Sequence, residues 1–108
     1  MIFTLDELKQ KITPIAQQYE LPAVYLFGSY ARGEANENSD VDLLINRDGS
    51  KIVTLFDLGA LYNDLNENLN KGLDLLTEDA LLQEEAKRRT PGFLETIQRE
   101  RVAIYEQC

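Results

Sequence analysis

The chain of 108 residues contains no histidine and a single cysteine, Cys108. Without histidine, neither a Ser-His-Asp triad nor a histidine-bound zinc site can form. One cysteine cannot make an intrachain disulfide, which fits a reducing compartment. The sequence has no apolar run long enough to cross a membrane, and its first residues lack the basic start and apolar stretch of a signal peptide. We therefore expect a cytoplasmic protein.

Basic residues are scarce beside acidic ones: 11 Lys and Arg against 19 Asp and Glu give a net charge of −8. Non-specific binding to nucleic acid depends on Lys and Arg that neutralise phosphates, so this balance argues against direct nucleic-acid binding. An anionic nucleotide remains compatible with the charge, because a bound divalent metal ion inverts it locally. The acidic surface suits a basic protein partner.

The length, an apolar fraction of 44% and a charged fraction of 28% predict one globular domain over residues 1–108. The spacing of apolar residues alternates between helical and strand periods. It predicts strands at about 23–27, 40–46, 73–76 and 102–105, and helices from residue 5, at 30–34, 53–69, 78–86 and 93–100. We expect an α/β or α+β domain, in which helices flank a small mixed sheet of about four strands.

Capping residues and one proline mark the expected helix ends. Thr4 and Glu7 have capping-box spacing and predict the start of the first helix. At Pro14, either this helix kinks or a second helix starts there with Thr13 as its cap. Lys71-Gly72 follows the helix at 53–69, and a cation with a glycine commonly closes a helix.

The most informative segment lies between the first two expected strands. A Gly28-Ser29 turn ends the first, and ten residues separate Ser29 from Asp40 of an Asp40-x-Asp42 pair. Side chains alternate along a strand, so both carboxylates project from one face. They repel each other unless a cation lies between them, and Mg²⁺ is typically held by carboxylates and substrate phosphates. A small-residue turn offers backbone N–H groups to such phosphates, so the pattern indicates transfer of part of a nucleoside triphosphate.

Asp74 lies in the middle of the apolar strand expected at 73–76. An aspartate there is costly unless it is paired, hydrogen-bonded or bound to a metal ion. If this strand lies beside the strand at 40–46, Asp74 joins Asp40 and Asp42. Three carboxylates can hold two ions, one on the triphosphate and one that activates the attacking hydroxyl.

Gly28-Ser29, the ten-residue gap, Asp40-x-Asp42 and the later strand aspartate, Asp74, together resemble the nucleotidyltransferase superfamily related to DNA polymerase β. Within it, the short chain and the run Leu-Phe-Gly-Ser-Tyr-Ala-Arg-Gly-Glu resemble the minimal nucleotidyltransferases, the MntA-like antitoxins. The resemblance implies the nucleotidyltransferase fold along the whole chain.

The resemblance also implies roles for single residues. Gly28 and Ser29 would hold the β and γ phosphates of ATP. Asp40 and Asp42 would coordinate two Mg²⁺ ions, and Asp74 would bind the catalytic ion and help to deprotonate the acceptor.

Arg32 is a further candidate for nucleotide binding. It would face the triphosphate, or would pair with Glu34 or with an aspartate of the cluster. The sequence leaves both possibilities open.

Members of the antitoxin group typically act with a HEPN-domain ribonuclease toxin, to which they transfer AMP from ATP on a tyrosine hydroxyl. The resemblance thus implies a protein adenylyltransferase with ATP as substrate, Mg²⁺ as cofactor and a HEPN toxin as partner in a hetero-oligomer. Two alternatives stay open: an antitoxin that neutralises its partner by binding alone, and nucleotidyl transfer to a small molecule. No acceptor-binding domain is evident for the second.

Overall fold

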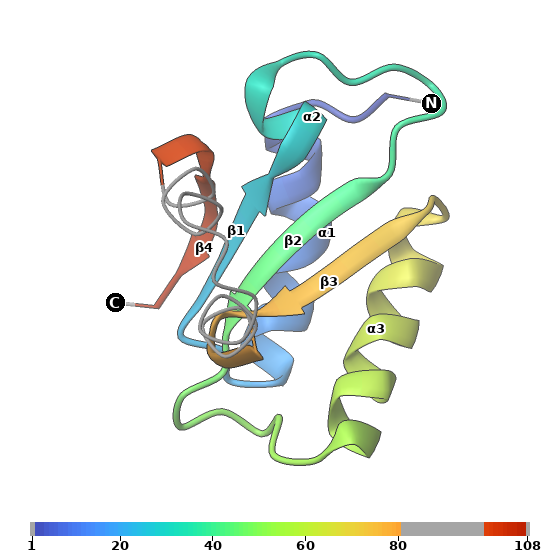
Figure 1. The fold of residues 1–108 in the computed structure, drawn as a ribbon. Coiled ribbons are helices and arrows are strands. Elements are labelled where there is room, and N and C mark those ends of the chain that lie inside the picture. Colours follow the sequence, from blue (N-terminus) through green and yellow to red (C-terminus); the bar gives the residue numbers. More distant parts are fainter. Residues whose placement is uncertain (1, 81–98, 108) are drawn as a thin grey trace.

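The computed structural model describes residues 2–80 and 99–107 (Figure 1). Its elements are α1 (Leu5–Gln18), β1 (Ala23–Phe27), α2 (Gly28–Arg32), β2 (Val41–Asn46), α3 (Leu55–Leu69), β3 (Leu73–Thr77) and β4 (Val102–Glu106). The strands form one sheet in the order β3-β2-β1-β4. Strand β1 runs antiparallel to both neighbours, whereas β2 and β3 are parallel. The expected mixed four-stranded sheet flanked by helices is confirmed.

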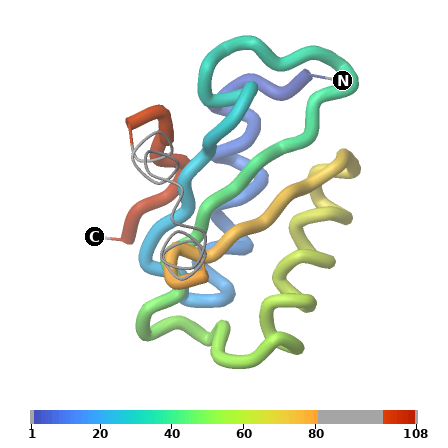
Figure 2. Tube along the Cα trace, in the orientation of Figure 1, coloured from blue at the N-terminus to red at the C-terminus, as the bar shows by residue number. Residues whose placement is uncertain are grey.

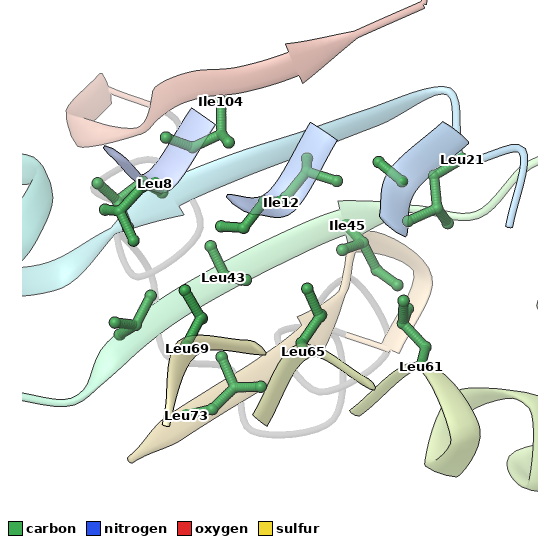
Figure 3. Packing of buried hydrophobic residues seen from close by; sticks show 14 of the residues in the cluster. Leu8, Ile12, Leu21, Leu43, Ile45, Leu61, Leu65, Leu69, Leu73 and Ile104 are labelled. Carbon is green, nitrogen blue, oxygen red and sulfur yellow. The ribbon is translucent and has the colours of Figure 1, made fainter. Parts of the chain in front are cut away.

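Helices α1 and α3 lie against the same face of the sheet (Figures 1 and 3). A layer of aliphatic side chains fills the space between helices and strands: Leu8, Ile12, Leu43, Ile45, Leu61, Leu65 and Leu69. Each of these side chains is at most 3% exposed. Burial on this scale stabilises by about 1.5–3 kcal/mol per side chain. The layer holds β2 in one orientation, so its alternate residues face away from both helices.

Helix α1 begins at the predicted capping box. The backbone N–H of Glu7 donates to Thr4 Oγ1 at 3.1 Å, and the N–H of Thr4 donates to Glu7 Oε1 at 3.0 Å. The helix continues through Pro14 to Gln18, so a second helix starting at Pro14 is wrong. Pro14 is exposed, while buried residues of α1 lie on both sides of it along the chain. Packing of that apolar stripe therefore outweighs the single helical hydrogen bond that proline cannot make.

The two ends of the sheet have different surroundings (Figure 2). The loop at 33–40 arches over one end, together with the segment that precedes α1. Helix α3 begins beyond the other end, after β2 has finished, and returns to the point where β3 starts. Because α3 is the crossover between two parallel strands, β2 and β3 begin at the same end of the sheet.

Two expected helices lie mostly outside the described residues. Of the helix expected at 78–86, residues 78–80 are helical, and the N–H of Ala80 donates to Thr77 Oγ1 at 3.3 Å. The helix expected at 93–100 overlaps the described part only at residues 99 and 100. Among the described residues, no helix combines the length and apolar character needed to span a bilayer.

Candidate active site

Asp42 and Asp74 are register partners on neighbouring parallel strands, β2 and β3. Their side chains therefore project from the same face of the sheet, close to each other. That face is the one opposite α1 and α3, because Val41 and Leu43, on either side of Asp42, point into the core. The expectation that the strand of Asp74 lies beside the strand of Asp42 is confirmed.

Asp40 lies one residue before β2, beside the start of β3. The N–H of Val41 donates to the carbonyl oxygen of Gly72 at 2.9 Å, which keeps the two chain segments together. The carboxylate of Asp40 lies against the Gly72 backbone, and a Cβ at Gly72 would overlap its Oδ1 atom. Asp40 thus sits at the same end of the sheet as Asp42 and Asp74.

The sequence interpretation missed this role of Gly72. It assigned Lys71-Gly72 to closing α3, but the helix is capped by Asn70 in the left-handed conformation, with φ of 50°. Gly72 instead leaves the space that the Asp40 carboxylate occupies. The sequence does contain a signal for this contact between Gly72 and Asp40. Gly72 precedes Asp74 by two residues, as Asp40 precedes Asp42.

Gly28 brings the turn after β1 against the same carboxylates. Its φ of 73° is in the region that favours glycine, and a Cβ there would overlap Oδ2 of Asp42. Gly28 opens α2, two residues earlier than the helix expected at 30–34. Within the described chain, no side chain caps this helix. The first N–H groups of a helix have no partner inside it, so those of Gly28 and the half-buried Ser29 could donate to phosphate oxygens.

The surroundings of Asp42 disfavour its ionised form. Partial burial raises the pKa of the Asp42 carboxyl above its usual value, and the charges of Asp74 and then Asp40 raise it further. The Arg32 guanidinium acts in the opposite direction and lowers it. A cation bound among the three aspartates would remove this mutual repulsion.

Arg32 lies near this cluster but pairs with glutamates. Its Nε atom is 3.1 Å from Glu34 Oε2, and its Nη1 atom is 3.4 Å from Glu100 Oε2. The Arg32 side chain is 42% exposed, so these pairs are screened by water and weak. The pairing with Glu34 is one of the possibilities that the sequence left open.

The three aspartates fit a divalent cation by chemistry and by placement. Carboxylate oxygens are the ligands that Mg²⁺ prefers, and all three lie at one end of β2 and β3. Within the described residues, however, no three acidic side chains converge closely enough to form a ready metal-binding cluster. Asp40 and Asp74 are exposed, so an ion from solvent can reach both carboxylates.

Partial burial of Asp42, together with repulsion from Asp74 and Asp40, predicts a pH-dependent stability in metal-free buffer. The folded protein holds its Asp42 proton more tightly than the unfolded chain does. Stability due to this group therefore falls as pH rises from the ordinary aspartate value, about 3.9, through the raised folded pKa. We expect the unfolding free energy of D42N to increase relative to that of the wild type as pH rises through this range. Urea unfolding in the presence of EDTA at several pH values measures the difference. A stability difference between D42N and the wild type that stays constant with pH would contradict the raised pKa of Asp42.

The sequence of this chain is similar to those of known proteins. Residues 10–107 match the family described as polymerase beta, nucleotidyltransferase. The chain belongs to this nucleotidyltransferase family. The nucleotidyltransferase is also similar to the protein adenylyltransferase MntA of Thermococcus cleftensis, with 30% identity over 95% of this chain and 98% of that protein.

Solved structures agree on the fold. A structure described as a "putative minimal nucleotidyltransferase" is 29% identical with a TM-score of 0.69, covering 93% of this nucleotidyltransferase and 95% of that chain. The complex of a tri-AMPylated Shewanella oneidensis HEPN toxin with an MNT antitoxin also matches, with a TM-score of 0.61. That match has 16% identity and covers 96% of this nucleotidyltransferase and 74% of that chain, so it shows the fold alone.

Proposed function

We propose that this chain is a Mg²⁺-dependent protein adenylyltransferase, an MntA-like antitoxin that transfers AMP from ATP to a tyrosine hydroxyl of a HEPN ribonuclease toxin. The observation that carries the proposal is the in-register pair Asp42 and Asp74, with Asp40 and the Gly28 turn at the same end of the sheet. The similarity to the protein adenylyltransferase MntA supports the type of reaction. An ATP-dependent reaction of this kind belongs in the cytoplasm.

In this proposal the Gly28 turn holds the triphosphate. The N–H groups of Gly28 and Ser29 and the Ser29 hydroxyl donate to β and γ phosphate oxygens, which orients the α-phosphorus toward the aspartates. Arg32, once released from its exposed glutamate pairs, is close enough to Asp42 to affect the same charges. Two Mg²⁺ ions held by Asp40, Asp42 and Asp74 would neutralise the triphosphate and favour ionisation of the attacking hydroxyl.

The transfer is an in-line displacement at the α-phosphorus. The tyrosine oxygen forms a bond to this phosphorus while the bond to the α–β bridging oxygen breaks. Pyrophosphate leaves, AMP remains on the tyrosine, and the hydroxyl proton passes to the Asp74 carboxylate. Asp74 suits this role because it is exposed at the edge strand β3, where an acceptor from another protein can approach.

Charge supports a protein partner of opposite sign. The chain carries a net charge of −8, and a surface that binds and cleaves RNA needs basic residues. The structural neighbour that contains a HEPN toxin and an MNT antitoxin supports this class of partner. AMP on such a toxin would add bulk and negative charge where RNA phosphates bind.

A non-catalytic antitoxin is the competing proposal. One observation favours it: in the described chain the three acidic side chains do not converge into a ready metal site. In that case the protein would neutralise its partner by covering it, and nucleotide would be irrelevant.

One experiment separates these proposals. The purified protein is incubated with Mg²⁺, α-labelled ATP and the product of a neighbouring gene that encodes a small helical protein with an Arg-x4-His motif. We expect label to be retained on that partner and its ribonuclease activity to fall in step. Binding and inhibition without label would favour the non-catalytic antitoxin, and label on neither protein together with no binding would contradict the proposed function.

A further inference from the structure

Three apolar side chains just before and at the start of α3 are largely exposed. Val53 is 72% exposed, Leu55 85% and Phe56 90%. We define these residues as the α3 patch. Single exposed apolar residues are common, but a contiguous group is typical of an interaction site. Among the described residues nothing covers the α3 patch, so it is a candidate contact surface for a partner.

Side-chain hydrogen bonds hold the backbone under the α3 patch. Asp57 Oδ2 accepts from the N–H groups of Val53 and Thr54 at 3.0 and 2.9 Å. The N–H of Asp57 donates in turn to Thr54 Oγ1 at 3.2 Å. Arg47 Nη1 donates to the Val53 carbonyl oxygen at 3.3 Å, while its Nη2 atom is 2.7 Å from Asp79 Oδ2. Because the chain is already ordered, a partner that binds the patch loses little affinity to ordering.

The exposed side of α3 continues the patch with small and uncharged residues. Gly59, Ala60 and Asn63 follow Phe56 at helical spacing, and all three are exposed. A Cβ at Gly59 would meet nothing within 4 Å, so packing inside the described chain does not require this helix-weakening residue. Small residues here allow a partner to approach the helix closely.

The charges of α3 decide which occupant fits. The helix carries Asp57, Asp64 and Glu67 and has neither Lys nor Arg. Before the helix, Arg47 is paired with Asp79, and Lys51 is exposed two residues from Val53. A second copy packed across the same face would place acidic residues against acidic residues in a chain of net charge −8. A partner with an apolar depression bordered by Lys and Arg would be complementary in both respects.

The patch is also placed away from the catalytic end. Helix α3 begins beyond the end of β2, whereas Asp42 and Asp74 lie near the beginnings of β2 and β3 (Figure 1). We propose that the α3 patch is the docking surface for the basic acceptor protein, separate from the aspartates that act on its tyrosine. This inference rests on the proposed function, because it assigns a surface to the acceptor of that reaction.

The test compares matched variants in two assays. L55S/F56S removes the patch, and L5S is its control: Leu5 is 43% exposed and opens α1 behind the equivalent capping box. The affinity of each variant for the neighbouring gene product is measured by calorimetry at two NaCl concentrations. The rate of label transfer is measured at a partner concentration below saturation. We expect L55S/F56S to lose at least about 30-fold in affinity and in transfer, while Mg-ATP raises its melting temperature as in the wild type. The affinity and the label transfer of L5S should stay within about twofold of the wild type, as expected for a residue outside the energetic centre of an interface.

Two variants of opposite charge at one position test the chemistry of the occupant. N63K and N63E place opposite charges at one exposed position beside the patch. For a basic partner, N63K should weaken binding and N63E should not. A wild-type dimer that N63K strengthens and L55S/F56S dissociates would instead identify a second copy as the occupant and overturn the proposal.

The possible failures are distinguishable. A wild-type protein that labels its partner while L55S/F56S labels it equally well contradicts the patch and leaves the proposed function intact. A wild-type protein that neither binds nor labels contradicts the proposed function and, with it, this occupant of the patch.

Discussion

Replacing Asp42 by asparagine should reduce nucleotide transfer by about a hundredfold to a thousandfold, the cost of removing one well-placed charge-stabilising group. Asn keeps the shape of the side chain but removes the charge that a divalent cation would bind between β2 and β3. The same change should not destabilise the protein, because burial and the charges of Asp74 and Asp40 already raise the pKa of Asp42. Initial rates of label transfer and melting temperatures measure the two effects.

The control for this variant is D48N. Asp48 is exposed in the turn after β2, at the opposite end of that strand from Asp42. It carries the same charge and should leave both transfer and stability within experimental error. Undiminished transfer by D42N would show that the metal site was assigned to the wrong residues.

Replacing Gly28 by alanine should lower both stability and transfer. At φ of 73° an L-residue is strained, and the added methyl group would overlap the Asp42 carboxylate. We expect a loss of about 1–3 kcal/mol in unfolding free energy, the usual cost of a strained backbone position. The rate of transfer should fall by more than the loss of folded protein explains, because the methyl group displaces a carboxylate that the reaction requires. Chemical unfolding and label transfer test the two effects separately.

Gly33 provides a matched control. It has the same φ of 73°, but a Cβ there would meet nothing within 4 Å. G33A therefore reports the backbone strain alone, and the difference from G28A reports the contact with Asp42. In a D42A background, G28A should cost less, since the overlapping carboxylate is gone. Equal costs in both backgrounds would rule out the contact as the cause.

Much of the fold was predictable because it depends on local spacing. The limits of β1 follow from an apolar run between Pro22 and Gly28, and α3 follows from leucines at helical intervals. The placement of Asp74 beside Asp42 stayed conditional in the sequence, because it depends on the pairing of two strands whose aspartates lie 32 positions apart. For β1 and α3, residues close together in the chain contain the information.

The details that sequence reasoning missed depend on contacts across long distances in the chain. Arg32 pairs with Glu100, 68 residues further along, which no local pattern indicates. Gly72 looked like the end of a helix, yet its backbone makes room for Asp40, 32 positions earlier in the sequence. Pro14 favoured a break that packing of α1 overrides. Such features are set by tertiary structure, which outweighs local propensity.

The parallel pairing of β2 with β3 has a consequence for synthesis on the ribosome. A parallel neighbour cannot be joined by a tight hairpin, so α3 must emerge in full before β3 can align with β2. A nascent chain that has exposed only the first two aspartates lacks Asp74 and the Gly72 backbone against which Asp40 rests. The arrangement thus delays assembly of the complete acidic trio until a large part of the translated chain has left the exit tunnel.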